Sequence, residues 1–159
     1  MPSKIDGKKV GFVGAGAMAE ALARGFVDKK VIESSDIWCC DPSKSRMDVF
    51  TEFGANAVKD GPEVRSSFSC PCHCRLVPLP ELQRSTHIGK HNHAFSPMQI
   101  AQNVDIIFIS VKPQYVGVVI KEMKPHLTGK HIMVSIAAGI PLSVMKVCCR
   151  PNLKRFSYS

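Results

Sequence analysis

The feature that most constrains the fold of this chain is a run of small residues, Gly14-Ala15-Gly16-Ala17-Met18-Ala19, which has the form G-x-G-x-x-A. It follows residues 9–13 (Lys-Val-Gly-Phe-Val), an apolar run that predicts a buried strand. It also opens residues 18–27, whose apolar spacing predicts a helix. A strand, a glycine turn and a helix in this order are typical of a dinucleotide-binding unit.

Each small residue in this run has a physical reason. Gly14 permits the tight turn, Gly16 lets a pyrophosphate approach the backbone, and Ala19 lets the helix pack closely on the strand. The pyrophosphate would then lie on the free N–H groups and the positive dipole end of the helix. A bare G-x-G-x-x-A is a weak signal, because small residues are common in turns. The agreement of the flanking strand and helix favours a real site over a purely structural turn.

The rest of the chain alternates strands with helices. The pattern predicts strands at 36–40, 55–58, 104–111 and 130–137, and helices at 44–53 and 114–123, with Gly54 as a C-cap. This alternation predicts an α/β fold with a Rossmann-like parallel sheet, incomplete and with a disordered insertion. We expect an NAD(P)-binding domain over residues 1–146, interrupted by the insertion 64–99, and a non-native-looking tail over 147–159.

The predicted insertion and tail account for the unusual composition of the chain. Of the formal net charge of +8, each of the two segments carries +3, which leaves +2 for the rest. The basic balance is therefore local and does not indicate a nucleic-acid partner. Outside the two segments only Cys39 and Cys40 remain, which suits a reducing compartment.

Three interpretations of the insertion remain open. A plain disordered loop is the one we expect, since it has four prolines and no period. Its ends, and the start of the tail, also admit codons that resemble splice sites, so the chain can be a truncated, non-catalytic NADP(H)-binding product of aberrant splicing. The series Cys70-x₃-Cys74-x₁₂-His87-x₃-His91 matches zinc-finger spacing, but prolines disfavour that unit and we predict no metal site.

Two further segments qualify as cofactor contacts, since the carboxyl ends of parallel strands are where such sheets bind ligands. They are Ser110-Val111-Lys112-Pro113-Gln114 and Ala137-Ala138-Gly139-Ile140-Pro141. After the second strand, Asp41 suits the ribose hydroxyls of NAD, whereas Ser43, Lys44 and Arg46 suit the 2′-phosphate of NADP. A simple helix cap with solvated basic residues is the alternative, and the residues alone leave the choice open.

The chain shows no sign of a membrane or secretory segment. No apolar run approaches the ~18 residues that a membrane span needs. Residues 1–10 are charged and lack the apolar stretch of a signal peptide. We therefore expect a cytoplasmic location without a membrane partner.

The sequence resembles pyrroline-5-carboxylate reductase in four segments. They are Lys9–Phe26 (K-V-G-F-V-G-A-G-A-M-A-E-A-L-A-R-G-F), Asp48–Ala55 (D-V-F-T-E-F-G-A), Asp105–Gln114 (D-I-I-F-I-S-V-K-P-Q) and Ile132–Pro141 (I-M-V-S-I-A-A-G-I-P). The resemblance implies an oxidoreductase of proline biosynthesis that reduces 1-pyrroline-5-carboxylate to L-proline with NAD(P)H. It favours NADP(H), with NAD(H) as the alternative.

The resemblance also implies roles for individual residues. Phosphate contacts carry over to Gly14, Gly16, Ala17 and Met18, adenosine contacts to Ser43 and Arg46, and nicotinamide contacts to Val111, Lys112, Pro113, Ala137, Ala138 and Gly139. The family also has a helical domain that forms the oligomer and supplies substrate contacts, which these 159 residues do not match. We therefore name no catalytic residue, and this chain alone can prove inactive.

Overall fold

The structure is a computed structural model, and it describes residues 7–58, 96–137, 139 and 155–158. Its strands are β1 (Val10–Val13), β2 (Ile37–Cys40), β3 (Asn56–Ala57), β4 (Ile106–Ile109), β5 (Ile132–Ser135) and β6 (Arg155–Tyr158). Its α-helices are α1 (Ala17–Asp28), α2 (Lys44–Glu52), α3 (Pro97–Asn103) and α4 (Pro113–Met123). Two 3₁₀ turns, η1 (Ser34–Asp36) and η2 (Lys124–His126), complete the described elements.

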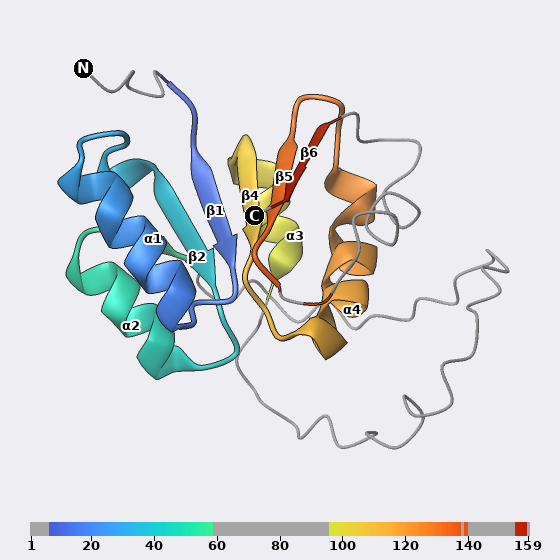
Figure 1. Ribbon diagram of the computed structural model, residues 1–159, viewed down its shortest axis with the longest axis horizontal. Coiled ribbons are helices and arrows are strands. Elements are labelled where there is room, and N and C mark those ends of the chain that lie inside the picture. The colour runs from blue at the N-terminus through green and yellow to red at the C-terminus, as the bar shows by residue number, and fades with distance from the viewer. Residues whose placement is uncertain (1–6, 59–95, 138, 140–154, 159) are drawn as a thin grey trace, which may run out of the picture.

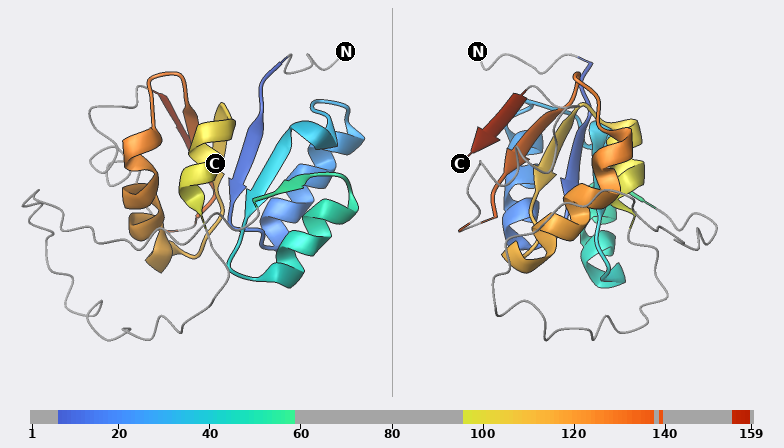
Figure 2. Two further views of the ribbon diagram at one scale, coloured as in Figure 1. Left: turned by 180° about the vertical axis from the view of Figure 1, so that it is seen from behind. Right: turned by 90° about the vertical axis from the view of Figure 1, so that its right-hand side faces the viewer.

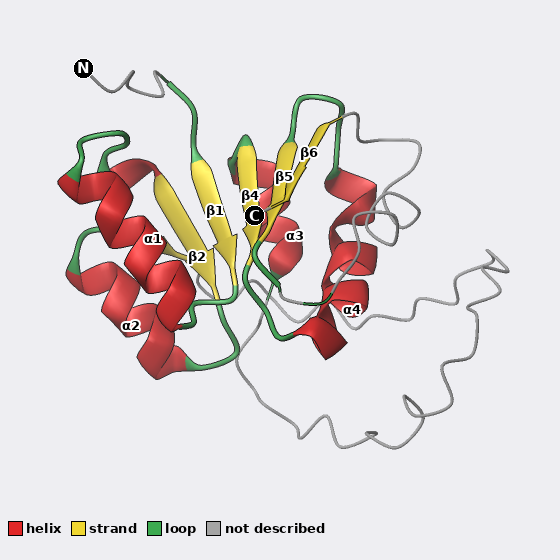
Figure 3. Ribbon diagram, in the orientation of Figure 1, coloured by secondary structure: helices red, strands yellow, loops and turns green. Residues whose placement is uncertain are grey.

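The six described strands form one parallel sheet in the order β3-β2-β1-β4-β5-β6. The order reverses direction at the β1–β4 pair, where Val13 aligns with Ile109. In Figure 3 the strand arrows point toward one edge of the sheet, so the loops that follow the strands gather there. A parallel sheet with this order confirms the predicted Rossmann-like α/β class.

Helices cover both faces of the sheet, and each face has its own apolar core (Figure 1). On one face, Ala19 and Ala23 of α1 and Phe50 of α2 pack against Phe12 of β1. On the other, α3 and α4 supply side chains such as Ile100 and Val116. The view from behind shows α3 lying over the strands of this second face (Figure 2). Because both faces are covered, the strands are apolar on both sides, as their sequences indicated.

Helix α3 packs unusually close to β1. A methyl group placed on Gly11 of β1 would overlap the Cγ2 of Ile100 and lie 2.9 Å from the Cγ2 of Val104. Gly11 is therefore the residue that lets α3 approach the sheet, because any side chain would fill the space between them.

The structure corrects the end of the predicted insertion. We expected residues 64–99 to lie outside the plan of elements, yet α3 begins at Pro97, so Pro97-Met98-Gln99 belong to a helix. Proline suits the first turn of a helix, because the N–H that it lacks would have no partner there. Pro97 therefore does not argue against a helix at this point. Residues 64–95 lie outside the described part of the chain.

The structure adds a strand within the predicted tail. We expected residues 147–159 to form a non-native-looking tail without an element of the sheet. Instead, Arg155–Tyr158 form β6 and pair in parallel with β5, with Met133 opposite Phe156. The backbone groups along the edge of β5 are a template for another strand, and a short segment with aromatic residues suits that edge.

Candidate functional site

The predicted glycine turn lies between β1 and α1, at the carboxyl edge of the sheet. Gly14 has a φ of +97°, which glycine adopts readily and other residues rarely do. Its N–H donates to the carbonyl oxygen of Cys40 at 2.9 Å, which ties the turn to the end of β2. This conformation confirms the prediction that Gly14 permits a tight turn.

Gly16, Ala17 and Met18 open helix α1. Gly16 is its N-cap, with φ −68° and ψ 175°, and no atom lies within 4 Å of the place where a Cβ would stand. Ala17 and Met18 are exposed, and Met18 is 68 % accessible although it is a large apolar residue. Ala19 is fully buried against the sheet, as its small size predicted. The first turn of α1 is therefore exposed at Ala17 and Met18.

The turn is fixed from the side of β4 by Ser110. Its Oγ lies 2.6 Å from the carbonyl oxygen of Gly14 and 3.0 Å from that of Val13. A methyl group on Gly14 would lie 2.8 Å from the carbonyl oxygen of Ser110 and 3.0 Å from the Cγ1 of Val111. The ends of β1 and β4 are thus in direct contact, which brings the segment that begins at Ser110 to the glycine turn.

Asp41 follows β2 and turns its carboxylate toward the backbone. Its Oδ2 accepts from the N–H of Ala15 at 2.7 Å, and its Oδ1 accepts from the N–H of Ser43 at 2.8 Å. These two hydrogen bonds tie Asp41 to the glycine turn and to the start of α2, and each oxygen can still accept a second donor. Ser43 is the N-cap residue of α2 but makes no side-chain capping hydrogen bond, and its Oγ lies 2.9 Å from the Oγ of Ser45.

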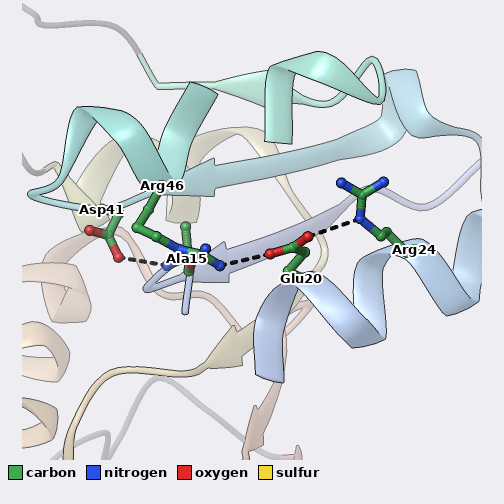
Figure 4. Close-up of polar contacts among 5 residues, drawn as sticks. All are labelled: Ala15, Glu20, Arg24, Asp41 and Arg46. Atoms are coloured by element: carbon green, nitrogen blue, oxygen red, sulfur yellow. Dashed lines mark hydrogen bonds and ion pairs between the residues drawn. The ribbon is translucent and has the colours of Figure 1, made fainter. Parts of the chain in front are cut away.

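Arg46 reaches from the first turn of α2 to the glycine turn. Its Nε donates to the carbonyl oxygen of Ala15 at 2.7 Å, and its Nη2 donates to the Oε2 of Glu20 at 2.9 Å (Figure 4). Glu20 also accepts from the Nε of Arg24 at 3.0 Å. Hydrogen bonds from Arg46 first, and then from Arg24, lower the pKa of the Glu20 carboxyl below its ordinary 4.5. The interpretation of Arg46 as a merely solvated residue is therefore wrong, whereas Lys44 is exposed.

The segments after β4 and β5 complete the edge. Val111 is half-buried beside Gly14, Lys112 is the exposed N-cap of α4, and Pro113 is its first residue. Ala137 is buried in the core below, and Gly139 is exposed with a φ of +76°. Ala138 lies outside the described residues. Because β4 and β5 are parallel neighbours, these residues share one edge of the sheet with the glycine turn.

Two buried cysteines lie directly below this edge. Burial raises the pKa of the Cys39 thiol to about 12, with a smaller contribution from the charge of Asp41. Burial also raises the pKa of the Cys40 thiol well above its ordinary value. Both side chains are inaccessible. A neutral buried thiol is a poor nucleophile, so Cys39 and Cys40 belong to the core.

Sequence reasoning missed Glu20. Its spacing of four residues from Arg24 indicated a helical ion pair. Its contact with Arg46, 26 residues away, depends on how α2 packs beside α1.

Two features of the described residues bear on other functions. Within them, no helix is long and apolar enough to cross a membrane. No group of three or more histidine, cysteine or acidic side chains in the same part of the chain could hold a metal ion. The Cys70–His91 segment lies outside it, so the zinc interpretation gains no support.

Comparison with known proteins identifies the family. The family model described as "NADP oxidoreductase coenzyme F420-dependent" matches residues 9–66 and 80–139. Pyrroline-5-carboxylate reductase 3 of Mus musculus is 31 % identical over 147 residues, which cover 92 % of this chain and 40 % of that protein. Pyrroline-5-carboxylate reductase of Arabidopsis thaliana is 31 % identical over 144 residues, which cover 90 % and 39 %.

Solved structures support the fold. A pyrroline-5-carboxylate reductase from Coxiella burnetii superposes with a TM-score of 0.63 at 18 % identity, over 91 % of this chain and 40 % of that one. The Plasmodium falciparum pyrroline carboxylate reductase with NADP bound gives 0.61 at 21 % identity, over 93 % and 41 %. The chain spans about 40 % of the length of the relatives that it matches. With a glycine turn of this geometry and a family match over most of its length, the chain belongs to the NADP oxidoreductase, coenzyme F420-dependent family, and it is similar to the N-terminal part of pyrroline-5-carboxylate reductases.

Proposed function

We propose that this chain supplies the dinucleotide site of a reductase that converts 1-pyrroline-5-carboxylate to L-proline, with NADP(H) as the preferred cofactor and NAD(H) as the alternative. The open first turn of α1 at Gly16-Ala17-Met18 is the observation that carries the proposal. The names of the curated relatives support the choice of reaction. Because the chain spans about 40 % of those relatives, the reaction is proposed and no catalytic residue is assigned.

The residues present fit a pyrophosphate. The space next to Gly16 is free of protein atoms within 4 Å of a would-be Cβ, so a phosphate can approach the backbone there. Helix α1 is 12 residues long, and its N-terminal N–H groups carry the positive end of the helix dipole. Gly14, Gly16, Ala17 and Met18 would hold the phosphates through the backbone. The exposure of Met18 fits a side chain that a bound cofactor covers.

Ser43 and Arg46, which follow β2, favour NADP(H). Each carboxylate oxygen of Asp41 accepts one backbone N–H and keeps room for a further donor, so Asp41 does not decide between NAD(H) and NADP(H). Ser43 and Arg46 flank the start of α2 on the same side and would lie near the adenosine. Arg46 carries a guanidinium, which suits a phosphate. A relative crystallised with NADP bound agrees with this choice.

The residues after β4 and β5 would form the floor of the nicotinamide site. Val111, Lys112 and Pro113 follow β4, and Ala137, Ala138 and Gly139 follow β5. Bound NADPH would supply the hydride needed to reduce the substrate C=N bond, and the accompanying proton would come from solvent. Small residues at this floor would let the ring approach the backbone and would exclude water from one side.

The remaining parts of the proposal concern partners. We propose a small-molecule substrate, a cytoplasmic location, and neither a nucleic-acid nor a membrane partner. Relatives of this name are expected to oligomerise through a domain that these residues do not match. A chain that binds NADP(H) without turnover is the second candidate.

A binding titration and a turnover assay test the proposal together. The purified chain is titrated with NADPH by nicotinamide fluorescence, and NADPH oxidation is then followed with 1-pyrroline-5-carboxylate. Saturable binding with proline formation supports the reductase, and binding without proline supports the second candidate. The Gly16→Val variant is the matched control, because it fills the space for the pyrophosphate and leaves the core intact. A chain that binds no dinucleotide overturns both candidates.

A further inference from the structure

We propose that Arg46 is a positioning residue for the glycine turn, and that it therefore supports the binding of NADH as well as NADPH. Glu20 holds its guanidinium in place. This inference rests on the proposed dinucleotide site and deepens it. A residue that only recognised a 2′-phosphate would matter to NADPH alone, so the two roles predict different results.

The guanidinium of Arg46 makes two contacts within the protein. The Nε contacts the carbonyl oxygen of Ala15 at 2.7 Å, and the Nη2 contacts Glu20 at 2.9 Å. These two donors belong to one planar group, so the two contacts fix its orientation as well as its place. The side chain is one-third exposed, and it spans from α2 across to the turn and α1 (Figure 4). These two contacts use only part of the guanidinium's N–H donors, and they direct that part at the protein's own turn and helix.

Ala15 is held from both of its peptide groups. Its N–H donates to the Oδ2 of Asp41 at 2.7 Å, and its carbonyl oxygen accepts from Arg46. Asp41 and Arg46 both follow β2, on the side of the site proposed for the adenosine. Residues on that side therefore hold the turn in place. Ala15 itself is fully buried, which leaves its backbone little freedom to find other partners.

A planar peptide carries this constraint to the next residue. The carbonyl of Ala15 and the N–H of Gly16 belong to one trans peptide group and point in opposite directions. When Arg46 fixes the carbonyl, it also fixes the direction of the Gly16 N–H at the start of α1. That end of the helix is where the pyrophosphate of either dinucleotide would lie. Arg46 thus prepares the turn for the part that NADH and NADPH share.

Glu20 completes the arrangement from α1. Its Oε2 accepts from Arg46 and its Oε1 accepts from Arg24. Arg24 pairs with the same carboxylate but has no contact with the turn, and it lies over the ring of Phe53 at 5.0 Å instead. Arg46 and Arg24 therefore offer a matched comparison, since both carry one positive charge and both bind Glu20.

The test compares Arg46→Ala with Arg24→Ala in the full chain. Each variant is titrated with NADH and with NADPH by nicotinamide fluorescence, and its melting temperature is recorded beside that of the wild type. We expect Arg46→Ala to weaken both dinucleotides by about tenfold, the size of the loss of one hydrogen bond from a charged donor. We expect Arg24→Ala to leave both affinities unchanged.

Two further variants keep the inference testable if Arg46→Ala fails to fold. Arg46→Lys retains the charge but lacks the planar fork, so it should still bind NADH more weakly than the wild type does. Glu20→Ala frees the guanidinium and should weaken NADH and NADPH by similar factors. A loss confined to NADPH in these variants overturns the inference and leaves the proposed function standing. A wild-type chain that binds neither dinucleotide overturns both.

Discussion

Ser110 donates a hydrogen bond to the carbonyl oxygen of Gly14 over 2.6 Å, although 96 residues separate the two along the chain. The backbone N–H of Ser110 also donates to the carbonyl oxygen of Val13 at 2.9 Å. These contacts join the carboxyl end of β4 to the turn after β1, at the place where the strand order reverses. The first and fourth strands therefore shape the candidate site together.

Replacing this hydroxyl should loosen the turn. We expect Ser110→Ala to lower the free energy of unfolding by about 1 kcal/mol, because the carbonyl oxygen of Gly14 loses its side-chain donor. NADPH affinity should fall as well. Urea denaturation and a fluorescence titration measure the two effects. Ser45→Ala is the control, because its hydroxyl meets only Ser43 at the surface. Equal results for the two variants would contradict the role given to Ser110.

The two glycines of the turn should respond differently to alanine. Gly14→Ala places a methyl group 2.8 Å from the carbonyl oxygen of Ser110 and demands a φ of +97°. We expect it to cost about 2 kcal/mol or more of folding stability. Gly16 has an ordinary φ of −68° and free space around it, so Gly16→Ala should fold as well as the wild type.

NADPH binding should distinguish Gly16→Ala from the wild type, although folding stability should not. The alanine at position 16 would occupy the space next to the pyrophosphate, so we expect it to abolish NADPH binding without a change in melting temperature. Differential scanning fluorimetry with and without NADPH checks both statements. If Gly16→Ala binds NADPH like the wild type, the pyrophosphate does not lie on this turn.

A glycine in β1 tests the packing of α3. Gly11→Ala would overlap Ile100 and approach Val104, and we expect a loss of about 1–3 kcal/mol because the core there is already full. Gly25→Ala in α1 meets no neighbour within 4 Å and replaces a poor helix former, so it should stabilise by about 0.5–1 kcal/mol. Urea unfolding measures the change in the free energy of unfolding for each variant. If α3 packs on β1 as described, this change is negative for Gly11→Ala and positive for Gly25→Ala.

Acid should weaken the contact between α1 and α2. Because Arg46 and Arg24 lower the pKa of the Glu20 carboxyl below 4.5, the charged form is favoured in the folded state. A lowered carboxyl pKa stabilises the fold above the unfolded value, and this contribution is lost as the pH falls through the folded pKa. We expect Glu20→Gln to remove that part of the stability loss below about pH 4.5. The unfolding midpoints of the wild type and of Glu20→Gln are measured across acidic pH. The difference in stability between the two proteins should disappear as the pH falls.

The buried thiols should be unreactive in the folded chain. The pKa of Cys39 is raised to about 12 and that of Cys40 is raised well above its ordinary value, so neither is a thiolate near neutral pH. We expect iodoacetamide at about pH 8 to leave the peptide that contains them unlabelled until denaturant is added. Peptide mass spectrometry locates the label, and rapid labelling of Cys39 in the native state would argue against its burial.

The sequence alone predicted most of the sheet and the turn. Apolar runs gave β1, β2, β4 and β5 to within a few residues, because strands covered on both faces need continuous apolar sequence. The glycine turn was predictable because its two glycines and Ala19 answer local steric needs. Local rules act over a few residues, and a sequence pattern displays them directly.

Other elements were decided by the tertiary structure. Strand β6 was not expected, since four residues with little pattern become a strand only when the edge of β5 offers them a partner. Residues 97–99 were assigned to the insertion, because the close fit of helix α3 on Gly11 involves a residue far away in the sequence. The roles of Asp41 and Arg46 were left open for the same reason. Their partners, Ala15 and Glu20, are 26 to 31 residues away, so only the packing of α2 beside α1 decides that they bind the protein's own turn.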